Sequence, residues 1–117
     1  MIFCIEYPSK ISAYGMNAIY AGKHWSKRKK DAEYWHLLTV NALRQQGIHR
    51  KLFDKPVEIT IFWNDRLDID NHAYMGKMIV DALKGYLIED DSRKYFVGIF
   101  HKFHNEKRIK VEVTEVK

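Results

Sequence analysis

The residues of this chain with the clearest chemical potential are two aspartates that directly follow an apolar, strand-like run. Asp68 and Asp70 are two positions apart, and side chains at this spacing point the same way in an extended chain. Paired carboxylates repel each other, and a hard divalent cation such as Mg²⁺ removes that repulsion because it prefers carboxylate oxygens. Asn71 comes next and could cap a helix or add an oxygen ligand. The segment therefore predicts a metal site, with helix capping and turn decoration as the alternative.

A second acidic cluster occupies residues 89–91, after a helix that the apolar spacing predicts over 75–83. The two clusters together could supply oxygens to one or two metal ions. A metal bound there would polarise a phosphodiester and generate hydroxide from water. Phosphodiester hydrolysis is therefore a candidate chemistry, because the paired aspartates are followed by a second acidic cluster after one helix.

Lys77 is a candidate partner for these acids. It lies seven residues after Asp70, close to two helical turns, so the two side chains share a face if both are helical. A lysine beside phosphate oxygens could stabilise developing negative charge. Asp81, four residues later, offers a plain ion pair instead, and the spacing alone favours that alternative. The six histidines show no metal-ligand spacing. His72 follows the paired aspartates and could support the metal ligands, but a surface position is the favoured expectation.

A basic and aromatic segment at residues 23–30 is the densest positive patch of the chain. It falls at the start of the first predicted helix, where cations oppose the helix dipole and add nothing to the fold. A phosphate group would be attracted by both the cationic side chains and the helix terminus. Nearby aromatic rings could stack on unpaired bases. A solvated charged face is the alternative, but the placement favours nucleic acid. The candidate nucleic-acid-binding residues of this segment are Lys23, Trp25, Lys27, Arg28, Lys29 and Lys30, with Tyr20 nearby.

The composition fits one globular domain with a polyanionic partner. The chain has 117 residues, 46% of them hydrophobic, which is enough for one packed core. Lys and Arg number 20 against 15 for Asp and Glu, which gives a formal net charge of +5. One cysteine excludes an internal disulfide and a zinc site of several thiolates. Because no signal-peptide pattern or membrane-spanning run is present, we expect a cytoplasmic protein without membrane contact.

Apolar periodicity predicts an α+β domain with one mixed β-sheet and two main helices, in the order β-α-β-α-β-β. Residues 9–25 show no period and are expected to form a loop, after which Ser26 is a candidate N-cap and Gly47 a stop signal. Residues 105–107 predict an antiparallel hairpin between the last two strands. The expected elements are strands over 2–7, 57–63, 94–104 and 109–113 and helices over 31–46 and 75–83.

Several short motifs follow one another in the second half of the chain. They are Asp68-Ile-Asp-Asn71, Lys77-Met-Ile-Val-Asp-Ala-Leu83, Gly85 and Ile88-Glu-Asp-Asp-Ser92. An early Pro8 after the first strand, the basic segment before the first helix and the terminal pair of strands complete the order. This ordered set resembles the RusA family of Holliday-junction resolvases. The resemblance extends over the whole chain, and its specific part is residues 68–92.

The resemblance implies one RusA-like endonuclease domain over residues 1–117 and a homodimer that nicks paired strands of four-way DNA junctions. It also implies a requirement for Mg²⁺, for which Mn²⁺ can substitute. The site residues that it implies are metal ligands at Asp68, Asp70 and Asp91, a further ligand or support at Asp90, and a catalytic lysine at Lys77.

We therefore expect a metal-dependent, structure-selective endonuclease that resolves Holliday junctions in DNA recombination and repair. The loop before Asp68 carries one basic residue, Arg66, which we expect to bind DNA together with the segment at residues 23–30. Two alternatives stay open: a nucleic-acid-binding protein without catalysis, and a related nuclease that acts on flaps or other branched substrates.

Overall fold

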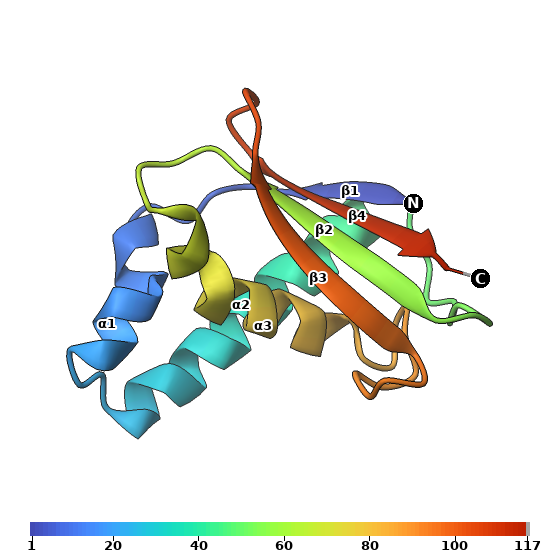
Figure 1. Cartoon of the computed structure of the whole chain (residues 1–117), viewed down its shortest axis with the longest axis horizontal. Coiled ribbons are helices and arrows are strands. Elements are labelled where there is room, and N and C mark those ends of the chain that lie inside the picture. The colour runs from blue at the N-terminus through green and yellow to red at the C-terminus, as the bar shows by residue number, and fades with distance from the viewer. Residues whose placement is uncertain (117) are drawn as a thin grey trace.

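Four strands form one mixed sheet in the order β1-β4-β2-β3 (Figure 1). β4 runs antiparallel to both of its neighbours, and β3 runs parallel to β2. The computed structural model describes residues 1–116. Its strands are β1 (Ile2–Ile5), β2 (Val57–Trp63), β3 (Phe96–Phe103) and β4 (Ile109–Glu115).

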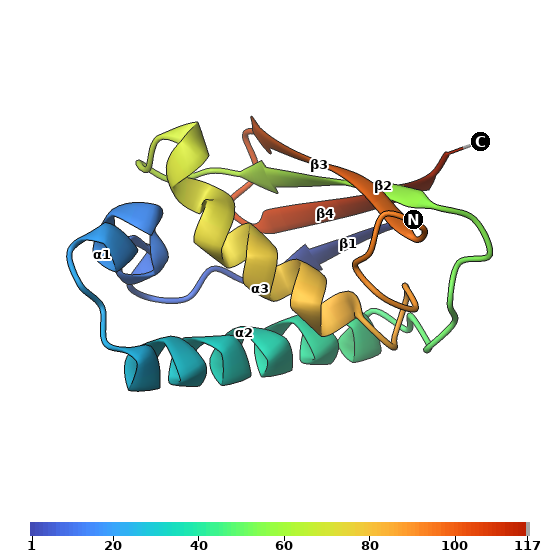
Figure 2. The ribbon, with the colours of Figure 1, turned by 60° about the horizontal axis from the view of Figure 1, so that its bottom comes forward.

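Two long helices cover one face of this sheet (Figure 2). α3 (Ala73–Leu83) crosses between the sheet and α2 (Trp25–Gln45), and α2 also contacts β1. The mixed sheet with two main helices confirms the predicted α+β class. None of the helices within residues 1–116 is long and apolar enough to cross a membrane.

The hairpin predicted between the last two strands is wrong. β3 and β4 lie on opposite sides of β2, and β3 pairs with β2 alone among the described residues. β4 takes a central place because its inward side chains Ile109, Val111 and Val113 are all buried. β3 can pair in parallel with β2 because α3 supplies the long crossover that a parallel connection needs.

The segment predicted as a loop over 9–25 contains two short helices, the 3-10 helix η1 (Ile11–Tyr14) and α1 (Met16–Tyr20). The first long helix begins at Trp25, well before the predicted start at residue 31. Its N-cap is His24 rather than Ser26, because the His24 ring nitrogen Nδ1 accepts the backbone N–H of Ser26 at 3.1 Å. This first part of α2 carries the run of cations, so it lacks the apolar periodicity from which a helix is predicted.

The core lies between the sheet and the two long helices. The alternation predicted for residues 57–63 is confirmed, because every second side chain of β2 from Val57 to Trp63 is fully buried. Trp35 of α2 is also fully buried. The buried residues of α3 are Met75, Gly76, Met78, Ile79, Val80, Ala82 and Leu83.

Gly76 marks the closest approach of α3 to β3. A Cβ atom at this position would lie 2.6 Å from Cε1 of His101 and 3.5 Å from Cδ1 of Ile99. Real Cβ contacts are never as short as the first of these distances, so only glycine lets the helix lie this close to β3.

We predict that Gly76→Ala lowers the melting temperature measured by circular dichroism. Alanine at an open helical position would instead stabilise the helix by about 1 kcal/mol. Overpacking against His101 should cost roughly 1–3 kcal/mol and outweigh that gain, with a net loss of up to about 2 kcal/mol. His101→Ala in the same chain should relieve much of the loss, and a higher melting temperature for Gly76→Ala alone would contradict the close packing.

Candidate functional site

The two paired aspartates lie where the chain passes from the sheet into α3. After β2 the chain turns through residues 64–68 and enters the 3-10 helix η2 (Ile69–His72), which continues directly into α3. Asp68 has an extended backbone at the start of η2, and Asp70 lies in its first turn. Both side chains are exposed, so a tight turn rather than a strand presents them to solvent.

Asp68 and Asp70 line one hollow of about 370 Å³ on the surface. Met16, Asn17 and Tyr20 of α1 form much of the rest of this hollow, and Tyr20 is 81% exposed. The structure therefore brings the paired aspartates together beside an aromatic side chain from the segment that was expected to be a loop.

Asn71 does not cap the helix that follows it, but its side chain bonds to the first turn of α1. Its side-chain oxygen accepts the backbone N–H of Asn17 at 2.8 Å, which ties η2 to α1. Gly15 packs so closely here that a Cβ atom would lie 2.8 Å from Nδ2 of Asn71. Of the two roles that the sequence left open for Asn71, capping of the following helix is wrong, because the N-cap of α3 is His72 and it makes no side-chain capping bond.

Lys77 connects the middle of α3 to the second acidic cluster. Its Nζ donates to Oδ1 of Asp81 at 2.8 Å and to Oδ2 of Asp91 at 3.3 Å. The ion pair with Asp81 is thus present, and so is a contact with Asp91, which the family resemblance implies as a metal ligand. Nζ of Lys84 lies 3.3 Å from the same oxygens of Asp81 and Asp91.

Charge pairing at this place shifts two pKa values in opposite directions. The ammonium groups of Lys84 and Lys77 lower the pKa of Asp91 by hydrogen bonding to its carboxylate. The hydrogen bond to Asp81, followed by the charges of Asp81 and Asp91, raises the pKa of Lys77. Asp91 is therefore ionised, and Lys77 carries its proton, near neutral pH.

The carboxylates fit a hard cation in kind, but they are not gathered into one cluster. Asp68 and Asp70 offer exposed oxygen donors, and Mg²⁺ commonly takes one or two carboxylates and keeps several waters. Asp91 follows the far end of α3, which spans 11 residues or about 16 Å. Within residues 1–116, no three His, Cys, Asp or Glu side chains lie close enough together to hold a metal.

Four of the predicted DNA-binding cations are free at the start of α2. Lys27, Arg28, Lys29 and Lys30 are exposed, and no ion pair involves them in the part of the chain that the structure describes. Trp25 beside them is 64% exposed. Figures 1 and 2 place the start of α2, α1 and the start of α3 at the same end of the molecule.

Lys23 and Arg66 differ from these four. Lys23 forms an ion pair with Asp31, donates to the carbonyl of Ala13 at 2.8 Å and lies over the ring of Tyr14 at 5.2 Å. Its side chain is only 13% exposed, so Lys23 holds η1 against α2 rather than facing solvent. Arg66 is exposed in the loop before Asp68.

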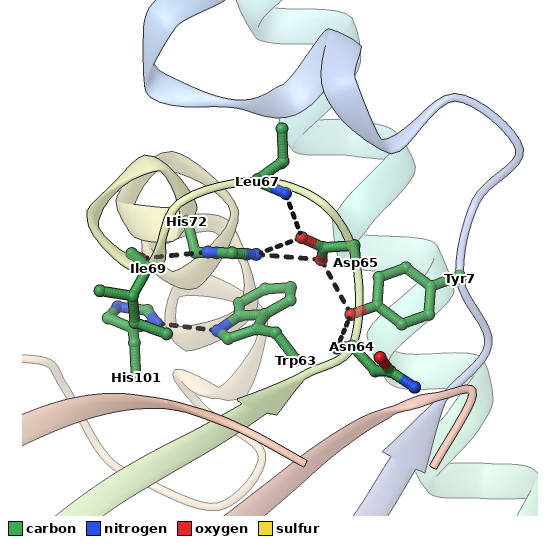
Figure 3. Close-up of polar contacts among 8 residues, drawn as sticks. All are labelled: Tyr7, Trp63, Asn64, Asp65, Leu67, Ile69, His72 and His101. Carbon is green, nitrogen blue, oxygen red and sulfur yellow. Dashed lines mark hydrogen bonds and ion pairs between the residues drawn. The ribbon is translucent and has the colours of Figure 1, made fainter. Parts of the chain in front are cut away.

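A buried polar network supports the loop that carries the paired aspartates (Figure 3). His72, which was expected at the surface, is fully buried, and its Nε2 lies 2.9 Å from both carboxylate oxygens of Asp65. The hydroxyl of Tyr7 donates to Oδ2 of Asp65 at 2.9 Å. Nε1 of Trp63 donates to Nδ1 of His101 at 3.0 Å.

Burial dominates the pKa shifts in this network. It raises the pKa of Tyr7, and the hydrogen bond to the Asp65 carboxylate adds to that effect. It lowers the pKa of His101, and the nearby charge of His72 lowers it further. Neutral His101 can therefore accept the indole N–H of Trp63.

Sequence reasoning favoured a surface position for His72 and missed its partner Asp65, although two signals for this network exist. Asp65 continues the inward parity of Ile61 and Trp63 beyond the end of the strand, so an acid occupies an inward position. His72 precedes Met75 and Ile79 by three and seven residues, which places it on the buried stripe of α3. Polar residues at such positions are expected to have buried hydrogen-bond partners.

Comparison with known protein families identifies the family that the sequence motifs resemble. The family model described as endodeoxyribonuclease RusA matches residues 13–114. No curated protein matches the chain significantly. The matched range includes the basic start of α2, the paired aspartates, Lys77 and Asp91. The chain therefore belongs to the RusA family of endodeoxyribonucleases, and this membership indicates a nuclease of the Holliday-junction resolvase type.

Proposed function

We propose that the protein is a magnesium-dependent endonuclease that resolves four-way DNA junctions by paired nicking during recombination and repair. One observation carries the proposal beyond family membership. The hollow lined by Asp68 and Asp70 lies at the same end of the molecule as the free cations at the start of α2. A phosphate backbone held by those cations would pass close to the paired carboxylates.

Asp68 and Asp70 are the proposed ligands of one Mg²⁺. Asp91, with Asp90 as a further donor, follows the far end of α3, so these two acids are the proposed ligands of a second metal ion. A bound metal would supply Lewis acidity and a water molecule of lowered pKa. Lys77, held in its protonated form by Asp81 and Asp91, would stabilise negative charge that develops on the phosphate. The exposed rings of Tyr20 and Trp25 would stack on bases unpaired at the junction.

A homodimer would give this activity its symmetry, because a two-fold axis would present one site to each of two opposed strands. The edge strand β3 supports this part of the proposal. Its outer edge has no partner strand within residues 1–116. Its exposed apolar side chains are Val97, Ile99, Phe100 and Phe103. A long apolar edge of this kind is usually covered, and a second copy of the chain would cover it.

A nucleic-acid-binding protein without catalysis is the second candidate. The pairing of Asp91 with Lys77 and Lys84, apart from Asp68 and Asp70, is the observation that favours it. A nuclease acting on flaps shares every feature of the first proposal except the substrate. Cleavage of four-way junction, flap and linear duplex, each with and without Mg²⁺, would separate the three.

We predict that Asp70→Asn reduces Mg²⁺-dependent nicking of a labelled four-way junction by at least about 100-fold, because it removes a charged ligand. Junction binding in a mobility-shift assay without metal should be unchanged. Asp54→Asn, at an exposed aspartate remote from the hollow, makes the same chemical change and should retain activity. Full nicking by Asp70→Asn would defeat the proposed metal site.

We further predict that Lys27→Gln combined with Lys30→Gln weakens junction binding and its dependence on salt. If each lysine contacts one phosphate, the slope of log K against log salt should become smaller by about 1.8. Lys51→Gln with Lys55→Gln removes the same charge in the exposed segment before β2, at the other end of the molecule. An equal loss in both pairs would mean that net charge, and not the start of α2, determines binding.

A further inference from the structure

We propose that Asp65 and His72 form a clamp that closes the loop of residues 64–72 and thereby positions Asp68 and Asp70 for metal binding. We call this pair the Asp65–His72 clamp. Neither residue belongs to the ordered motifs that identify the family in this chain. The inference rests on the proposed function, since it concerns the same two carboxylates, and it assigns Asp65 and His72 as positioning residues.

The Asp65 carboxylate has hydrogen-bond partners in three separate parts of the chain, which are the loop itself, the segment after β1 and the end of η2. Its side chain is only 6% exposed. Oδ1 accepts the backbone N–H of Leu67 at 2.9 Å, and Oδ2 accepts the hydroxyl of Tyr7, just beyond β1. The Tyr7 oxygen in turn accepts the backbone N–H of Asn64 at 2.6 Å. The start of the loop is therefore fixed to the end of β2 and to the segment that follows β1.

His72 closes the other end of the loop. Its Nε2 lies 2.9 Å from both oxygens of the Asp65 carboxylate, and its Nδ1 lies 3.1 Å from the carbonyl oxygen of Ile69. Both partners are hydrogen-bond acceptors, one on each side of the ring, so together they fix the ring orientation. One buried side chain thus joins the first residue of η2 to the beginning of the loop.

Trp63 and His101 support the His72 ring from behind (Figure 3). The rings of His72 and Trp63 are 4.4 Å apart between centroids and inclined by 33°. The indole of Trp63 is itself held by its hydrogen bond to His101, and His101 packs against Gly76 of α3. The clamp is therefore built on β2, β3 and α3, which are rigid elements.

The clamp contacts alternate with the two carboxylates along the chain. Leu67 and Ile69 flank Asp68, and Ile69 and His72 flank Asp70. Neither Asp68 nor Asp70 has a side-chain hydrogen bond or ion pair within residues 1–116, so their positions follow from the backbone. The clamp holds that backbone together with the bond between Asn71 and Asn17. Metal and phosphate chemistry is sensitive to small displacements of the groups that hold the reactants. Loss of the clamp should consequently weaken metal binding more than it weakens the fold.

The test combines hydrogen–deuterium exchange of residues 64–72 with Mn²⁺ titration by calorimetry, both on the full chain. Asp65→Ala should speed exchange in this loop by at least about tenfold and weaken Mn²⁺ binding by about 10–100-fold, as loss of a supporting shell typically does. Exchange in β2 and α2 should be unchanged. Asp65→Asn keeps the shape of the side chain and an acceptor for the Leu67 N–H, so it should retain most of the slow loop exchange and of the Mn²⁺ affinity. Asp54→Ala, at the exposed position, is the matched control and should resemble the wild type.

Tyr7→Phe provides a milder variant in case Asp65→Ala fails to fold. It removes only the outer hydrogen bonds to Asp65 and Asn64, and it should change both measurements in the same direction by a smaller factor. Loop exchange like that of the wild type in Asp65→Ala, or in Tyr7→Phe if only that variant folds, would overturn the clamp. Faster exchange with unchanged Mn²⁺ affinity would overturn its positioning role. A wild-type protein that binds no Mn²⁺ would instead defeat the proposed function, while loop exchange would still decide whether the clamp holds the loop.

Discussion

The packing of α3 between the sheet and α2 is the constraint on which the rest of the structure depends. Seven of its 11 residues are buried, so the helix cannot slide or rotate without exposing apolar surface. Its amino end continues from the loop that carries Asp68 and Asp70, and its exposed side presents Lys77. Gly76 allows the helix to approach His101 closely, which links the same helix to the buried network behind the loop.

Charged side chains in this protein divide into two groups by burial. Lys23 and Asp65 are largely buried, and each is held by several partners, as a buried charge must be to avoid a large desolvation cost. Asp68, Asp70 and the cations at the start of α2 are exposed and make few internal contacts. The first group holds the short helices and the loop in place, and the second group is available to a metal ion or to DNA.

The sequence predicted best where one apolar period extends over a whole element. β2 matches its predicted range, and α3 begins two residues before its expected start. Prediction failed where another feature determined the outcome. The cations of residues 27–30 concealed the first turns of α2, and the alternation of β4 could not reveal that it pairs with β1 and β2. An alternating run indicates which face is buried, but it does not identify the neighbouring strand.

The sequence by itself determined the fold class, the paired aspartates, Lys77 with its ion-pair partner Asp81, and the basic start of α2, because each depends on local spacing or residue type. Only the tertiary structure decided that Asp91 reaches Lys77, that Lys23 is buried against Asp31, and that His72 and Asp65 meet beneath the loop. These contacts join segments through packing of the helices and the sheet, so no local pattern encodes their geometry. The three aspartates remain the proposed ligands, but the fold places Asp91 beside two lysines and leaves Asp68 and Asp70 together at the hollow.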